Sequence, residues 1–349
     1  MQPRLLRMAQ SSVPCLLALT LICLPLSLQA VTPPARLNST FLQLSRQHQN
    51  WTDTQWADLF NYFRKLQLSE VFVQWTAYDD LRFYGTNSTL DKVLVAASHA
   101  GLKVWVGLYS DSGYWNRVGN GQDTRAFLND LRSRSLAIAR DLAPFLKQQS
   151  SFAGWYLPEE VEDVNWQTLE ARRELLLHLG LVSRGLHELT PRAPVAISAF
   201  SDARISPAEF RDFWLEVFDA TSVDTVLLQD GIGVHKLELD EFPLYAGALA
   251  KAAHSKGRDF RIVVELFQQT GGVPLDSGPF RASSAHWERV RAQMESANQF
   301  TTSIVGFSIP EYMTPLGIAG AEKLYADYLK GAVTGVSTTV DRERSNNLK

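Results

Sequence analysis

Short apolar runs alternate with longer amphipathic segments along most of the chain. Runs such as Val71-Phe72-Val73 lack polar alternation, which is typical of parallel strands buried on both faces. These runs predict eight strands, over residues 39–44, 70–75, 103–109, 152–157, 193–200, 223–229, 261–267 and 303–309. The segments between them carry apolar residues at every third or fourth position, and they predict helices.

Capping signals support several of these helices. Thr54 is predicted to cap the first helix, and Ser88 with Asp91 three residues later forms a capping-box pattern. Gly101 is predicted to end that second helix, and Ser206-Pro207 marks the start of another.

Eight strand–helix units in one chain, without a linker or a change of composition, predict a single α/β domain with a (β/α)₈ TIM-barrel fold. We place this domain at residues 31–336 and expect the polar tail at 337–349 to be disordered. A doubly wound sheet is the alternative fold. It usually carries a glycine-rich phosphate loop after the first strand, and this sequence has none there.

The N-terminal segment has the pattern of a secretory signal peptide. Arg4 and Arg7 precede an apolar stretch at 13–28, and Ala30 offers a small residue for cleavage. We therefore predict a signal peptide at 1–30, export across the inner membrane, a periplasmic location and no membrane span after cleavage. A retained N-terminal anchor is the alternative.

Composition narrows the functional classes. The formal net charge is −3 and no basic stripe is present, so we expect no nucleic-acid partner. Cys15 and Cys23 both lie in the predicted signal peptide, which leaves the rest of the chain without thiol chemistry. The seven histidines do not form a ligand pattern, and His235 is interpreted as a surface residue. We expect neither a metal ion nor a cofactor.

A cluster of acidic residues follows the fourth predicted strand. Pro158 is predicted to end that strand, and four carboxylates come directly after it: Glu159, Glu160, Glu162 and Asp163. Crowded, partly desolvated carboxylates repel one another, so a fold tolerates them mainly where they have a task. We expect a functional role for Glu159 and Glu160. Helix capping or exposure to solvent is the expectation for Glu162 and Asp163.

Glu265 is a second candidate, because a carboxylate near the end of an apolar strand needs a partner or a function. A salt bridge to an arginine or lysine is the structural alternative. Amide, acidic and aromatic residues also gather at the predicted strand ends, where a barrel carries its chemistry. Those predicted to bind substrate are Gln43, Gln74, Trp75, Tyr109, Trp115, Tyr156, Gln229, Asp230, Glu311 and Tyr312. This mixture suits a carbohydrate. For the single aromatic residues, packing is the alternative, and the glycines beside Asp230 could serve a turn.

Carboxylates after strands four and seven resemble those of the clan of retaining (β/α)₈ glycosidases. The chain more closely resembles an uncharacterised family of bacterial, glycosidase-like TIM-barrel domains. The segments that carry this resemblance are Thr40-Phe41-Leu42-Gln43, Val73-Gln74-Trp75-Thr76, Gly154-Trp155-Tyr156-Leu157-Pro158-Glu159-Glu160 and Gly306-Phe307-Ser308.

The resemblance implies a glycoside hydrolase in which Glu160 is the acid/base and Glu265 the nucleophile. A retaining mechanism would require their carboxyl groups to lie roughly 5 Å apart. Consecutive strand residues point in opposite directions, so we expect one of Glu159 and Glu160 to face the cleft, with Glu159 as the alternative acid. The clan has Asn-Glu after strand four, and here Glu159 replaces the asparagine.

A non-catalytic carbohydrate-binding protein is the competing interpretation, for example a periplasmic component of polysaccharide synthesis or export. The missing asparagine favours it. A raised carboxyl pKa favours the enzyme, because a working acid depends on such a shift and a binding site does not.

Overall fold

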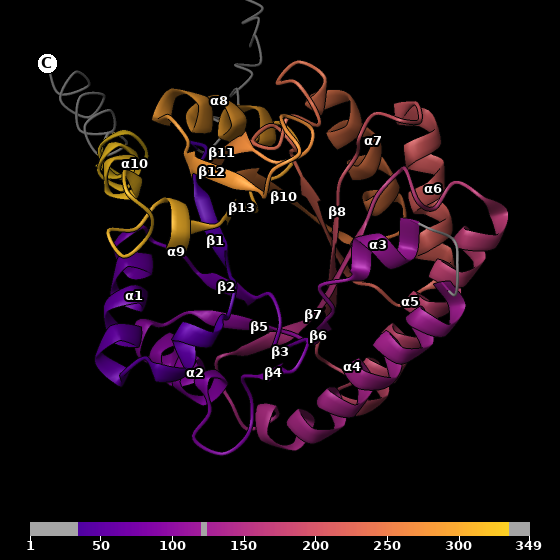
Figure 1. Cartoon of the computed structure of the whole chain (residues 1–349), viewed down its shortest axis with the longest axis horizontal. Coiled ribbons are helices and arrows are strands. Elements are labelled where there is room, and N and C mark those ends of the chain that lie inside the picture. The colour runs from indigo at the N-terminus through magenta and orange to yellow at the C-terminus, as the bar shows by residue number, and fades with distance from the viewer. Residues whose placement is uncertain (1–33, 120–123, 335–349) are drawn as a thin grey trace, which may run out of the picture. The chain divides into compact units, whose positions relative to one another are not determined.

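A closed barrel of eight parallel strands forms the centre of the protein (Figure 1). The structure is a computed structural model that describes residues 34–119 and 124–334, so the predicted signal peptide and the tail at 337–349 lie outside it. The barrel strands are β1 (Leu37–Leu42), β2 (Glu70–Val73), β5 (Lys103–Gly107), β7 (Phe152–Val161), β8 (Val195–Ala199), β9 (Thr225–Gln229), β10 (Asp259–Glu265) and β13 (Ile304–Phe307). The predicted (β/α)₈ barrel is confirmed.

A long helix follows each barrel strand and packs on the outside of the sheet (Figure 1). These helices are α1 (Asp53–Lys65), α2 (Thr89–Ala100), α4 (Thr124–Leu146), α5 (Leu169–Leu189), α6 (Pro207–Ala220), α7 (Phe242–Ser255), α8 (Trp287–Ala297) and α10 (Ala321–Tyr328). Within residues 34–119 and 124–334, every helix is too short or too polar to cross a membrane.

Side-chain caps define several helix starts. The hydroxyls of Ser88 and Ser206 accept main-chain N–H bonds, as their sequence patterns predicted. The prediction of Thr54 as the first cap was wrong. Thr52 accepts the N–H of Gln55 instead, and the Gln55 side chain bonds the main chain of Thr52 in return.

The barrel interior is filled by one buried side chain from each strand. These side chains are Phe41, Phe72, Trp105, Tyr156, Ala196, Leu227, Val263 and Val305. The rings of Phe72 and Trp105 stack with centroids 5.2 Å apart, and Phe41 meets Tyr156 at 5.3 Å. Tyr156 is fully buried here, so it offers no surface to a ligand, in contrast to its predicted role in substrate binding.

The β7 strand continues through Pro158, and the prediction that this residue ends the strand was wrong. Leu157 pairs with Ile197 of β8, and the next pair is Glu160 with Ser198. The two residues between form a bulge, in which a proline needs no ladder partner. The bulge re-aims the end of β7 and brings Glu160 to the mouth of the barrel.

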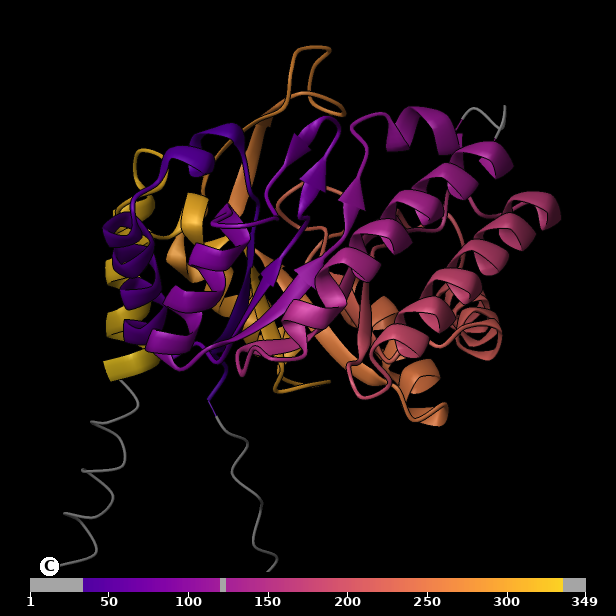
Figure 2. The same ribbon diagram turned by 90° about the horizontal axis from the view of Figure 1, so that it is seen from below.

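Smaller elements that the periodicity did not predict surround the C-terminal ends of the barrel strands. They are η1 (Arg46–Asn50), β3 (Ala77–Tyr78), β4 (Leu81–Arg82), β6 (Tyr109–Ser110), α3 (Tyr114–Gly119), β11 (Phe267–Gly271), β12 (Arg281–Ser284) and α9 (Ile309–Tyr312), while a π-helical turn η2 (Leu329–Thr334) follows α10. Figure 2 shows the β11–β12 hairpin rising on the same side of the barrel as the small β4-β3-β6 sheet. These insertions build the walls of a site above the barrel.

Close packing at the end of β5 generates a stability prediction. A Cβ atom on Gly107 would lie 2.2 Å from the main-chain oxygen of Gln74 and 2.4 Å from that of Val73. We expect Gly107→Ala to lower the free energy of unfolding by about 3 kcal/mol, measured by urea denaturation. Gly257→Ala is the control, because its Cβ would meet nothing within 4 Å and only its positive φ costs energy, about 1–2 kcal/mol. Equal losses in the two variants would contradict the packing argument.

Candidate active site

Two adjoining cavities lie at the C-terminal mouth of the barrel. The small cavity has a volume of about 250 Å³ and the large cavity about 750 Å³. Trp115, Glu160 and Phe307 line both of them. The two spaces therefore meet at Glu160.

A side-chain hydrogen bond from Gln229 holds Glu160 at this junction. Gln229 at the end of β9 donates from Nε2 to Glu160 Oε1 at 2.8 Å. Burial raises the pKa of Glu160, while the bond from Gln229 and the charge of Lys236 oppose the shift. A carboxyl group with a raised pKa that faces an open cavity has the properties of a general acid.

Glu265, the last residue of β10, lines the large cavity together with Glu160. Burial and the neighbouring Asp230 carboxylate raise the pKa of Glu265 to about 8. The main-chain N–H of Val234 donates to Glu265 Oε2 at 3.0 Å and opposes that shift. Arg289 donates to the main-chain oxygen of Glu265 at 3.3 Å, not to its carboxylate, so the predicted salt-bridge alternative is not what holds this side chain.

Asp230 lies beside Glu265 and has no exposed surface. Burial raises its pKa to about 6, and it accepts hydrogen bonds from Gln293 Nε2 and from the N–H of Ile232. The adjacent Gly231 has a φ of 67°, which a turn requires. Asp230 therefore lines neither cavity and acts on the Glu265 carboxyl group through its charge.

The small cavity brings together half of the polar and aromatic residues predicted to bind substrate, namely Gln43, Gln74, Trp75, Tyr109 and Trp115. Its side chains include Gln43, Gln74, Trp75, Tyr78, Tyr109, Tyr114 and Trp115. Gln43 Nε2 donates to Gln74 Oε1 at 2.8 Å, and Trp75 Nε1 donates to the main-chain oxygen of Leu44 at 2.7 Å. These bonds fix amide and indole groups in the wall before any ligand arrives.

Glu159 also borders the small cavity, but its carboxyl group turns away from Glu160 toward α5. Its Oε1 lies 2.9 Å from Nε2 of His178, and both side chains are almost fully buried. The Oε2 atom has no hydrogen-bond partner among the residues that the structure describes. Of the two glutamates, Glu160 is the one with a carboxyl group that faces both cavities.

Two predicted residues lie apart from the two cavities. Glu311 lines a separate side cavity with His48 and Trp51, and its carboxylate accepts a hydrogen bond from Ser308 Oγ. Tyr312 packs against the Phe267 ring with centroids 5.0 Å apart. Both residues belong to the short helix α9 after β13, and neither lines the cavities that meet at Glu160.

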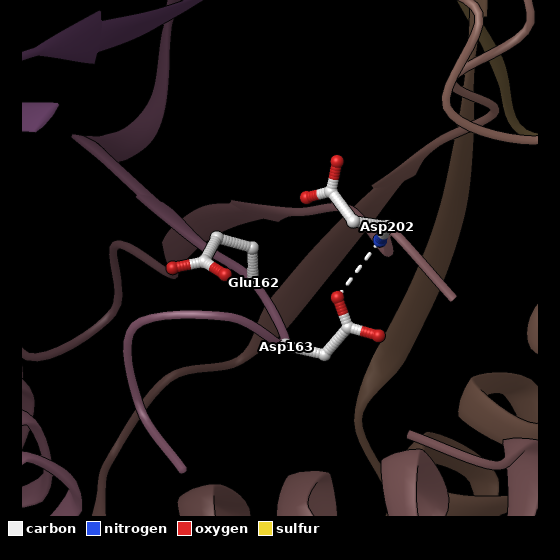
Figure 3. Close-up of side chains that lie close together, drawn as sticks. All are labelled: Glu162, Asp163 and Asp202. Carbon is white, nitrogen blue, oxygen red and sulfur yellow. Dashed lines mark hydrogen bonds between the residues drawn. The ribbon is translucent and has the colours of Figure 1, made fainter. Parts of the chain in front are cut away.

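Three carboxylates lie close together beside the large cavity, those of Glu162, Asp163 and Asp202 (Figure 3). Asp163 accepts the N–H of Asp202 at 2.8 Å, and Glu162 accepts the N–H of Asn165 at 3.0 Å. The helix that follows is capped by Thr168. The expectation that Glu162 and Asp163 cap that helix or face solvent was therefore wrong, because both are buried and stabilise loops.

Sequence reasoning missed two ionisable residues of the site, His178 and Lys236. His178 lies on α5 four residues after Glu174, and both are on the buried face of the helix. A polar residue on an otherwise apolar helix face was the sequence signal that could have identified His178. Lys236 lines the large cavity and its Nζ lies 3.1 Å from Asp202 Oδ2. Lys236 stands in an irregular segment after β9, where no periodicity could place it.

The closed (β/α)₈ barrel is similar in fold to solved structures described as glycosidases. A candidate α-L-fucosidase from Bacteroides thetaiotaomicron VPI-5482 superposes with a TM-score of 0.70 at 20% identity, covering 86% of this chain and 96% of that one. An endo-β-1,4-mannanase from Thermotoga petrophila gives a TM-score of 0.53 at 11% identity, covering 80% of this chain and 68% of that one. These likenesses show the fold.

The chain belongs to the family described as Domain of unknown function (DUF4434), which matches residues 37–318. It is also 33% identical over 232 residues to YbcH of Escherichia coli strain K12, described as an uncharacterized protein. That match covers 65% of this chain and 76% of YbcH. The predicted resemblance to a glycosidase-like family of unknown function is confirmed.

The raised pKa of Glu265 predicts a pH-dependent gain of stability when the charge is removed. Because this pKa rises from 4.5 to about 8 on folding, the folded state binds the proton more tightly and the wild type loses stability between those pH values. We expect Glu265→Gln to be more stable than the wild type at pH 8.5, with a much smaller difference at pH 4.5, by urea denaturation. The control is Glu295→Gln, a side chain 61% exposed on α8. A difference that does not change with pH would contradict the assignment.

Proposed function

We propose that the protein is a glycoside hydrolase that cleaves O-glycosidic bonds of a polysaccharide or oligosaccharide with Glu160 and Glu265. The observation that carries this proposal is a pair of carboxyl groups, both with raised pKa, on the walls of one cavity. The adjoining small cavity supplies amide and aromatic side chains, which suit the hydroxyl and C–H faces of a sugar.

The proposed chemistry is a double displacement. Glu160 protonates the departing glycosidic oxygen, and its raised pKa keeps that proton available. Glu265 attacks the anomeric carbon, and Glu160 then activates a water molecule that releases the sugar. Glu265 must be ionised to attack while Glu160 stays protonated, so the two raised pKa values predict a bell-shaped pH–rate profile that falls above pH 8, where Glu160 has lost its proton.

Non-catalytic carbohydrate binding is the second candidate function. The observation that favours it is Glu159, which stands where similar glycosidases have an asparagine and is held by His178. A protein that only binds a polysaccharide could use the same aromatic small cavity without any proton transfer.

Substitution of the two carboxyl groups tests the enzyme proposal. On any glycan or aryl glycoside that the wild type cleaves, we expect Glu160→Gln to lower kcat/KM by about 10²–10⁴-fold and Glu265→Gln by at least as much. Glu311→Gln is the matched control, because this half-buried glutamate lies outside the two cavities. Glycan binding that survives in all three variants, without hydrolysis by the wild type, would replace the enzyme by the binding function.

The stereochemistry of the product tests the mechanism separately. A double displacement releases the sugar with the anomeric configuration of the substrate, which proton NMR of the first product detects. A 2-deoxy-2-fluoro glycoside should add its sugar mass to the wild type and not to Glu265→Gln. Inverted product would show that Glu265 acts as a base.

We also propose that the protein is exported and works in the periplasm, which rests on the charged and apolar pattern of residues 1–30. Cell fractionation should find the full-length gene product in the periplasmic fraction, shortened by about that segment on mass spectrometry. A protein that keeps residues 1–30 and sediments with membranes would support the anchor instead.

A further inference from the structure

His178 connects two helices to the end of a barrel strand. Its Nδ1 lies 3.0 Å from the main-chain oxygen of Leu128 on α4, and its Nε2 lies 2.9 Å from Glu159 Oε1 on β7. The imidazole is 1% exposed and the Glu159 side chain 3%. Both ring nitrogens are therefore committed to partners inside the protein.

These two contacts determine how many protons the pair must hold. A carbonyl oxygen only accepts, so the contact with Leu128 requires a proton on Nδ1 of His178. The contact between Nε2 and Glu159 Oε1 then needs a second proton, carried either by the ring or by the carboxyl group. An imidazolium with a carboxylate and a neutral imidazole with a carboxylic acid are the two arrangements, and both have no net charge.

The charge of this pair matters because Glu160 is the next residue. An ionised Glu159 without His178 would place a buried negative charge beside the candidate acid, and its Oε2 has no partner among the described residues. The other titratable groups near these glutamates include Tyr114 from α3, Tyr156 on β7 and Lys236 after β9, and the carboxyl groups of Glu162 and Glu265 line the large cavity with Glu160. Burial raises the pKa of both tyrosines well above 10, so they stay neutral and leave the balance to the histidine.

We propose that Glu159 and His178 share one proton as a buried neutral pair, and that His178 is a positioning residue that lets Glu160 titrate without an uncompensated negative charge on Glu159. The catalytic consequence rests on the hydrolase function proposed above, whereas the shared proton does not. In this arrangement the glutamate that replaces the asparagine of similar glycosidases carries no uncompensated charge.

Spectroscopy on the full protein tests the shared proton without any substrate. In ¹⁵N-histidine NMR at pH 7, with the His178 signals identified by their loss in His178→Gln, we expect one of two results. Either both ring nitrogens are protonated, or Nδ1 alone is protonated and infrared spectra contain a carboxylic-acid band that disappears in Glu159→Gln. A neutral ring without that band, or a ring protonated at Nε2 alone, would overturn the pair.

Two variants separate the electrostatic role from a structural one. Glu159→Gln can donate its amide N–H to Nε2 and stay neutral, so the pKa of Glu160 should change by only a few tenths in a ¹³C-carboxyl titration. His178→Gln leaves Glu159 to ionise without compensation, so the pKa of Glu160 should rise by about one unit or more. The control is His99→Gln, an exposed site on α2. If the pKa of Glu160 shifts equally in the Glu159 and His178 variants, or in neither, the electrostatic role of His178 is contradicted.

The two proposals can fail separately. If no glycan is cleaved but the ring and carboxyl signals are as expected, the hydrolase proposal fails and the proton-sharing pair stands. If glycans are cleaved while His178 is a neutral ring beside an ionised Glu159, the hydrolase stands and the pair fails. Should His178→Gln not fold, the wild-type spectra and the Glu159→Gln titration still decide the question.

Discussion

The site depends on the closure of a parallel sheet around a filled interior. One side chain from each strand, including Phe72 and Trp105, occupies the centre of the barrel. A ligand therefore cannot enter the barrel, and it must bind where the strands end. Because all eight strands run in the same direction, β7, β9 and β10 deliver Glu160, Gln229 and Glu265 to the same mouth. Closure of the barrel thus places residues that are distant in sequence around the same two cavities.

Desolvation dominates the chemistry of these carboxyl groups. Burial is the largest cause of the raised pKa of Glu160, Asp230 and Glu265, and neighbouring hydrogen-bond donors reduce each shift without cancelling it. The desolvation of these buried carboxyl groups is offset by different neighbours at different positions. Asp230 and Glu265 lie close enough to affect each other's protonation, whereas Glu159 is paired with the imidazole of His178. Such arrangements separate the protonation states of adjacent acids, as two-carboxylate chemistry requires.

Fold and function rest on different arguments in this protein. The likeness to the fucosidase and mannanase structures, at 20% and 11% identity, shows a shared barrel. The case for hydrolysis comes from Glu160 and Glu265 on one cavity wall, and from the amides and aromatic rings beside them. Glu159 differs from Glu160 and Glu265 in its surroundings, because its carboxyl group contacts the imidazole of His178 and does not line the large cavity.

Local patterns in the sequence were sufficient for the elements and their order. Apolar runs and caps such as Ser88 and Ser206 act over a few residues, so they predicted the alternation of strands and helices and placed Glu265 at a strand end. They could not predict the bulge at Pro158, because its register is set by pairing with β8. They could not bring His178 to Glu159 either, since α5 reaches β7 only when the barrel closes. The sequence alone determined the barrel and its candidate carboxylates. Tertiary structure decided which of them face the cavities and which contact another buried side chain, because long-range packing controls burial and partners.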